Sequence, residues 1–163
     1  SKKYNILDSL YLLGGVYLLG FAFGYITYLK EVSFASCIYI FIISFVTDTY
    51  AYIGGSLVGK YTFTPISPKK TIEGSLIGML MGVVVGSVYY YNVIGNESVM
   101  YAILLSFSLA IISEIGDLLF SSIKRYYGVK DFSNLIPGHG GILDRFDSVI
   151  YVSLCMALIT SLF

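Results

Sequence analysis

The stretch VMYAILLSFSLAIISEIGDLLFSSI, residues 99–123, decides the fold class of this chain. Its only charged residues are Glu114 and Asp117. As a helix, it is long enough to cross the hydrocarbon core of a bilayer, which takes about 20 mostly apolar residues. The stretch therefore predicts a membrane-spanning helix.

The composition of the whole chain agrees with this prediction. Of the 163 residues, 56% are hydrophobic and 12% are charged, and the mean hydropathy is +0.80. Soluble domains carry about 25% charged residues, so this chain has too few charges to cover a soluble globular surface. The formal net charge is zero, which argues against nucleic acid as a partner. The length fits a single domain over residues 1–163.

Four further stretches resemble residues 99–123 in length and apolar character. The fold class is therefore an all-α polytopic membrane protein of about five transmembrane helices, and the fifth is the weakest because it begins with two aspartates. The expected spans are residues 8–29, 32–53, 72–91, 99–123 and 144–163. Two long connections, residues 54–71 and 124–143, lie between them.

The basic residues predict how the spans are oriented. If the N-terminus lies in the cytoplasm, every Lys and Arg except Lys30 falls on the cytoplasmic side. Basic residues are enriched in cytoplasmic loops. We therefore expect a protein integral to the cell (inner) membrane, with its N-terminus and both long connections inside and its C-terminus outside.

Carboxylates gather at the predicted cytoplasmic ends of the spans. Glu114 and Asp117 share one helix face, as do Asp144 and Asp147, and Asp48 lies at a similar depth on the second span. An ionised carboxylate within a membrane is costly unless it faces protein, water or a cation. Salt bridges to nearby basic residues would explain individual carboxylates. The convergence of several favours a hard divalent cation such as Mg²⁺.

The two long connections add glycines and cations. Residues 54–71, GGSLVGKYTFTPISPKKT, combine glycines that permit close backbone approach with lysines that can neutralise phosphate. They lack the complete G-x-x-x-x-G-K-[ST] pattern, so a P-loop is excluded. Residues 124–143 contain PGHGG with His139, and these lysines and this histidine could also be structural. Phosphoryl or nucleotidyl transfer to an amphiphile fits the pattern, which does not choose between a kinase and a nucleotidyltransferase.

Residues 121–147, SSIKRYYGVKDFSNLIPGHGGILDRFD, resemble the signature of the phosphatidate cytidylyltransferase (CDP-diacylglycerol synthase) family. The elements S-x-x-K-R, K-D, P-x-H-G-G and D-R-x-D stand in order. A second block, from Asp48 to Gly74, is also similar to this family. Typical members are longer and have additional N-terminal spans, so the chain resembles their C-terminal catalytic half.

The resemblance implies that CTP and phosphatidate react to give CDP-diacylglycerol and pyrophosphate in a membrane. It implies Mg²⁺ as cofactor, held by Asp117, Asp144 and Asp147, and leaves open a second, monovalent cation and a homodimer. The catalytic positions that it implies are Asp117, Asp144, Asp147, Lys124 and Arg125. The positions that it implies around the nucleotide and lipid phosphates are Asp48, Lys60, Ser67, Lys69, Lys70, Lys130, His139 and Arg145.

Three other functions stay open at this point. Archaeal relatives that make CDP-archaeol are also short five-helix proteins, but their loop differs from the HGG form seen here. A CTP-dependent lipid or polyprenol kinase would transfer the γ-phosphate and release CDP. An ion or solute carrier would need polar residues on both sides of the membrane midplane, whereas the outer halves of these spans are almost wholly apolar.

Overall fold

The computed structural model describes residues 5–95, 97–133, 135 and 140–162. Within these ranges the chain forms five long helices, a short π-helical turn and one two-stranded antiparallel hairpin. The helices are α1 (Ile6–Val32), α2 (Phe34–Val58), α3 (Ile72–Tyr89), η1 (Tyr90–Ile94), α4 (Val99–Tyr126) and α5 (Leu143–Leu162). The strands are β1 (Thr62–Thr64) and β2 (Ser67–Thr71).

The prediction of an all-α polytopic membrane protein is confirmed. Four helices, α1, α2, α3 with η1, and α4, are long and apolar enough to cross a membrane. The helix α5 occupies the predicted fifth stretch but is not among these four, and it begins with three charged residues within five positions. A fifth crossing therefore stays a prediction.

Local capping chemistry sets where the first two helices begin and end. Asn5 and Asp8 form a capping box at the start of α1, in which the side chain of each residue accepts the backbone N–H of the other. One residue, Ser33, then separates α1 from α2. Its backbone N–H donates to the Leu29 carbonyl, and its hydroxyl oxygen accepts the N–H of Ser36. The same serine thus ends α1 and begins α2, which makes the chain turn sharply.

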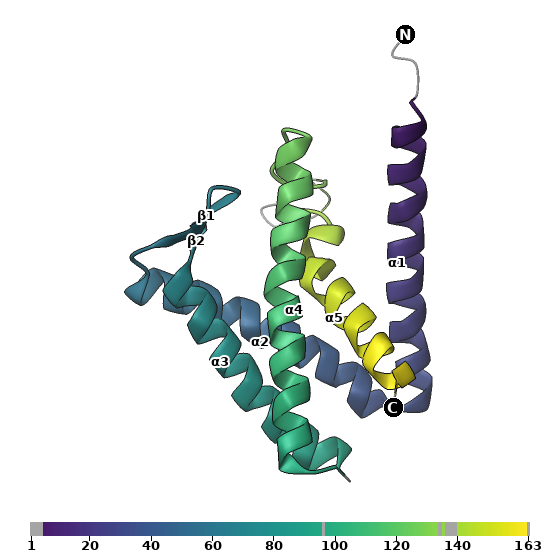
Figure 1. Cartoon of the computed structure of the whole chain (residues 1–163), viewed down its shortest axis with the longest axis vertical. Helices are drawn as coiled ribbons and strands as arrows, with labels where there is room; N and C mark the ends of the chain where they lie inside the picture. The colour runs from purple at the N-terminus through teal and green to yellow at the C-terminus, as the bar shows by residue number, and fades with distance from the viewer. Residues whose placement is uncertain (1–4, 96, 134, 136–139, 163) are drawn as a thin grey trace.

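The helices alternate between two ends of the molecule (Figure 1). The start of α1, the hairpin and the connection from α4 to α5 lie in the upper part of the view. The turns from α1 to α2 and from α3 to α4 lie in the lower part, as does the end of α5. The two long connections therefore share one end, as the sequence predicted.

A row of glycines brings α2 and α3 close together. A Cβ atom on Gly78 would stand 2.7 Å from the Ala51 Cβ and 2.8 Å from its backbone nitrogen, and Gly74 approaches the backbone of Gly55 in the same way. Small residues allow such close helix contacts in membranes. Gly54 and Gly55, expected in a loop, lie in the last turns of α2 and face α3. The expected loop therefore begins later, and the close approach that these two glycines permit is that of α3 to α2.

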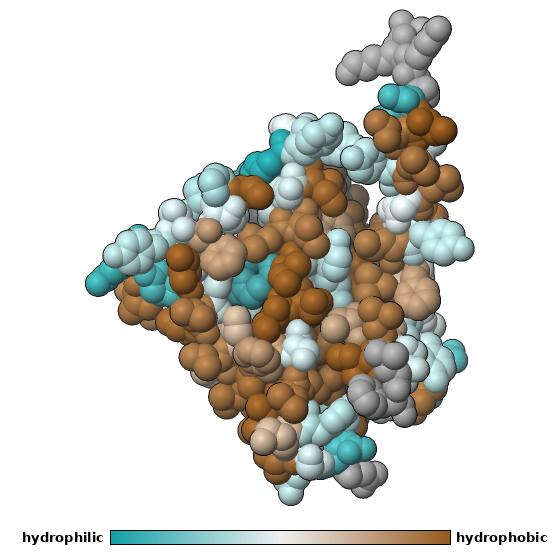
Figure 2. Space-filling model, viewed as in Figure 1, coloured by the Kyte–Doolittle hydropathy of each residue, from teal (hydrophilic) through white to brown (hydrophobic). Residues whose placement is uncertain are grey.

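The interior also contains polar groups at positions that the helices bury completely. The Tyr39 hydroxyl, on α2, and the Ser106 hydroxyl, on α4, lie 2.8 Å apart within the main hydrophobic cluster. By contrast, the face shown in Figure 2 is mostly hydrophobic over its broad middle, with hydrophilic residues along its upper edge and lower end. This distribution is that of a protein whose middle faces lipid.

The close contact of α2 and α3 gives a stability prediction. Gly78→Ala should lower the melting temperature in detergent, because overpacking of a tight contact costs about 1–3 kcal/mol. Gly24→Ala is the matched control, since a Cβ atom there meets nothing within 4 Å. Equal melting temperatures for the two variants would show that α2 and α3 are not in close contact.

Candidate functional site

One lysine of the hairpin joins two carboxylates of α4. Lys70, near the end of β2, places its Nζ 2.8 Å from Glu114 Oε2 and 2.6 Å from Asp117 Oδ2. The Ser75 hydroxyl, in the first turn of α3, donates to the same Glu114 oxygen at 3.3 Å. Burial by itself lowers the pKa of Lys70, but the charges of Asp117 and Glu114 outweigh it and raise that pKa. Lys70 therefore fixes the hairpin to α4 through two ion pairs.

A second lysine joins α4 to the start of α5. The buried side chain of Lys124 places its Nζ 2.9 Å from Asp144 Oδ1 and 3.7 Å from Asp147 Oδ2. The other oxygen of Asp144 accepts the backbone N–H groups of Phe132 and Gly141, both at 2.9 Å. Asp144 therefore binds both Lys124 and the backbone of the connection from α4 to α5.

Asp48, which lies on α2, connects the Lys70 group with the Lys124 group. Its Oδ2 accepts a hydrogen bond from the Ser148 hydroxyl of α5 at 2.7 Å. The same carboxylate is close enough to Asp117 and Asp147 for their charges to interact with it. Side chains from α2, β2, α4 and α5 thus form one charged cluster.

The charged cluster carries more negative than positive charge. Its members are the five carboxylates Asp48, Glu114, Asp117, Asp144 and Asp147 and the two lysines Lys70 and Lys124. An unpaired buried charge costs several kcal/mol. A group of this composition gains stability when a further cation binds to it.

Two unsatisfied oxygens show where the excess of acceptors lies. Asp48 Oδ1 and Glu114 Oε1 are buried and have no hydrogen-bond partner among the described residues. Across those residues, no three His, Cys, Asp or Glu side chains are arranged to hold one metal ion. The donor chemistry still fits Mg²⁺, which commonly uses one or two carboxylates and completes its shell with water and phosphate oxygens.

The comparisons with known proteins agree with the chemistry of this cluster. The model of the cytidylyltransferase family matches residues 3–163. The chain belongs to the cytidylyltransferase family. It is 38% identical to a phosphatidate cytidylyltransferase of Staphylococcus haemolyticus and 35% identical to one of Staphylococcus saprophyticus. Each alignment covers 93% of this chain and 59% of the relative, so the chain spans about three fifths of those relatives' length.

The structure assembles six of the residues that the family signature selects. They are Asp48, Lys70, Asp117, Lys124, Asp144 and Asp147. Sequence reasoning did not place Glu114 in the site, although it noted this carboxylate within the span. The position of Glu114 three residues before Asp117 was the available signal. The hydrogen bond of Ser148 to Asp48 was not predicted, and its position next to Asp147 was the only signal for it in the sequence.

The other predicted positions make separate contacts, are exposed or lie outside the described residues. Arg125 donates to the carbonyls of Ile66 and Val129, so it ties the hairpin to the end of α4. Ser67 begins β2 and pairs with Thr64. Four further basic residues, Lys60, Lys69, Lys130 and Arg145, are exposed. His139 lies outside the described residues.

The hairpin offers a matched pair of lysines for testing the charged cluster. Lys70→Met should destabilise the detergent-solubilised protein by about 3 kcal/mol, because it leaves Glu114 and Asp117 without their cation. Lys69→Met should change stability by no more than about 0.5 kcal/mol, since Lys69 is exposed. Thermal unfolding of both variants tests this. Equal stabilities would contradict the ion pairs described for Lys70.

Proposed function

We propose that this chain transfers CMP from CTP to phosphatidate and so forms CDP-diacylglycerol and pyrophosphate. The observation that carries the proposal is the charged cluster, in which five carboxylates and two lysines meet among helices of which several are long and apolar enough to cross a membrane. Carboxylates with a bound divalent ion, together with cations, suit a reaction between two phosphate-bearing reactants. The names of the curated relatives supply the two substrates.

The reaction needs little proton transfer. An oxygen of the lipid phosphate attacks the α-phosphorus of CTP, a new P–O bond forms, and the bond to the β-phosphate oxygen breaks to release pyrophosphate. A phosphate monoester is already ionised at pH 7, because its second pKa is about 6. The protein therefore has to bring two anions together and stabilise the leaving group, rather than supply a general base.

Each part of the charged cluster has a role in this proposal. One or two of the predicted ligands Asp117, Asp144 and Asp147 would hold Mg²⁺ together with water and phosphate oxygens, and the unsatisfied Asp48 Oδ1 is a further candidate ligand. The ion would supply positive charge that lowers the repulsion between CTP and the lipid phosphate. Lys70 and Lys124 pair with carboxylates in this structure, and incoming phosphate oxygens would compete for both ammonium groups. The monovalent cation and the homodimer stay predictions.

We also propose that the site faces the cytoplasm, with the N-terminus inside and the end of α5 outside. The support is the arrangement of the helices, because the start of α1 and both long connections share one end (Figure 1). Lys30 lies at the end of α1. Every other described basic residue lies in one of these two connections, in the end of α4 or in the start of α5. Such a bias is typical of the cytoplasmic side.

Product identification tests the proposed reaction. The protein in detergent should convert CTP and phosphatidate into a CDP-lipid and pyrophosphate when Mg²⁺ is present, and EDTA should stop the reaction. Release of CDP with a newly phosphorylated lipid would indicate the kinase alternative. Complete absence of nucleotide turnover with a folded protein would contradict both functions.

Substitution of one carboxylate tests the metal assignment. Asp144→Asn should lower kcat/KM by on the order of 100-fold or more, because the transition state loses charge stabilisation. Glu97→Gln, in the connection between η1 and α4, should leave the rate unchanged. Melting temperatures should accompany the rates, since Asp144 also accepts two backbone N–H groups. A folded Asp144→Asn variant with a near-normal rate would refute the assignment.

A further inference from the structure

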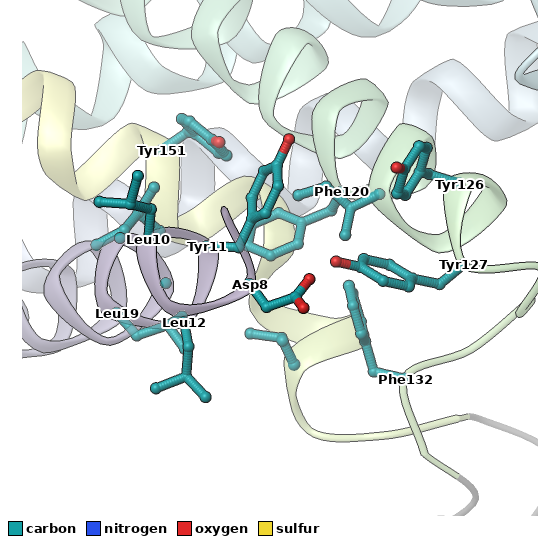
Figure 3. A pocket seen from close by; sticks show the side chains of 15 residues that line it. Asp8, Leu10, Tyr11, Leu12, Leu19, Phe120, Tyr126, Tyr127, Phe132 and Tyr151 are labelled. Carbon is teal, nitrogen blue, oxygen red and sulfur yellow. The ribbon is translucent and has the colours of Figure 1, made fainter. Parts of the chain in front are cut away.

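A pocket of about 690 Å³ lies between the first half of α1 and the helices α4 and α5. Figure 3 shows its position: Leu12 and Leu19 come from α1, Phe120 and Tyr126 from α4, and Tyr151 from α5. The start of α1 stands apart from the other helices there (Figure 1). Tyr127 and Phe132 also line it, so the pocket lies beside the connection from α4 to α5.

The lining of the pocket is almost entirely hydrocarbon and aromatic. Phe120 contacts Tyr151 on one side and Phe132 on the other, with ring centroids 5.7 Å and 5.8 Å apart, so three rings form a continuous wall. Polar groups are few. The Asp8 carboxylate and the Tyr127 hydroxyl point toward one another in Figure 3. A long apolar molecule with a polar end is the class of ligand that such a pocket suits.

One aromatic ring separates the pocket from the charged cluster. Phe132 lines the pocket, and Lys124 Nζ lies 5.3 Å from the centre of its ring. The backbone N–H of Phe132 donates to Asp144. A ligand with its chain in the pocket could therefore carry its charged end past Phe132 to Lys124. This continuity is what distinguishes the pocket from the rest of the lipid-facing surface.

We propose that this pocket binds a hydrocarbon chain of the lipid substrate and so directs its phosphate group to Lys124. This inference rests on the proposed function and adds a location for the lipid to it. Lipid tails in a bilayer are already in an apolar medium, so moving one into the pocket yields little hydrophobic energy. Affinity would then come mainly from the phosphate. The pocket would orient the lipid, which matters because correct placement of reactants lowers the barrier.

The glycines of α1 allow the pocket to be filled without disturbing the protein. Gly15 lines the pocket, and a Cβ atom there meets nothing within 4 Å. Gly24 has the same open surroundings on the same helix but does not line the pocket. Gly15→Leu and Gly24→Leu are therefore a matched pair, and both should keep the melting temperature of the unmodified chain or raise it.

Photocrosslinking tests the location independently of turnover. The probes are phosphatidate with a diazirine in one acyl chain and diacylglycerol with the same chain, each in phosphatidylcholine vesicles with the full chain. The phosphatidate probe should label pocket residues such as Leu12 and Tyr126, and excess unlabelled phosphatidate should compete. Equal labelling by the diacylglycerol probe, or labelling that avoids the pocket, would overturn the inference.

The two glycine variants test whether lipid binding in the pocket contributes to the reaction. Gly15→Leu should lower pocket labelling by about tenfold and raise the KM for long-chain phosphatidate several-fold, with the KM for CTP unchanged. Gly24→Leu should behave like the unmodified chain. Unchanged labelling in Gly15→Leu would overturn the inference. Pocket labelling without nucleotide turnover would support the lipid site and contradict the proposed reaction, and turnover without pocket labelling would do the reverse.

Discussion

The excess of carboxylates over lysines in the charged cluster is the constraint on which the rest of the structure depends. Lys70 holds the hairpin against α4, and Lys124 holds the start of α5 against the end of α4. Each ion pair lies where water is scarce, so losing either partner would leave an expensive unpaired charge. The two lysines therefore determine where two segments distant in sequence meet. The carboxylate oxygens of the charged cluster that have no hydrogen-bond partner among the described residues favour the binding of a further cation.

Close helix packing makes this cluster possible. The glycines of α3 let it approach the backbone of α2, and the hairpin between the two helices then carries Lys70 to Glu114 and Asp117. Asp48 of α2 accepts a hydrogen bond from Ser148 of α5. A larger residue at a position such as Gly78 would separate α2 from α3 and loosen the support of the cluster. Stability and the geometry of the site thus depend on the same contacts.

The helix α1, like α3, carries none of the seven residues of the charged cluster. Its contribution is one wall of the apolar pocket, whose opposite wall includes Phe132 beside Lys124. A polar region and an apolar region therefore meet at one aromatic ring. Such a boundary fits a reaction between a water-soluble nucleotide and a lipid, since each reactant needs a different environment up to the point where their phosphates meet.

The sequence by itself determined the five helices, the common end of the two long connections and the helix faces that carry Asp117, Asp144 and Asp147. These features follow from hydropathy and the period of one helix, which are local properties. Only the tertiary structure decided that Lys70 pairs with Glu114 and Asp117, that Gly54 and Gly55 pack helices, and that α1 encloses a pocket. The period of a helix says which residues share a face. The neighbour that this face meets depends on crossing angles and on the path of the connections, which no local pattern contains.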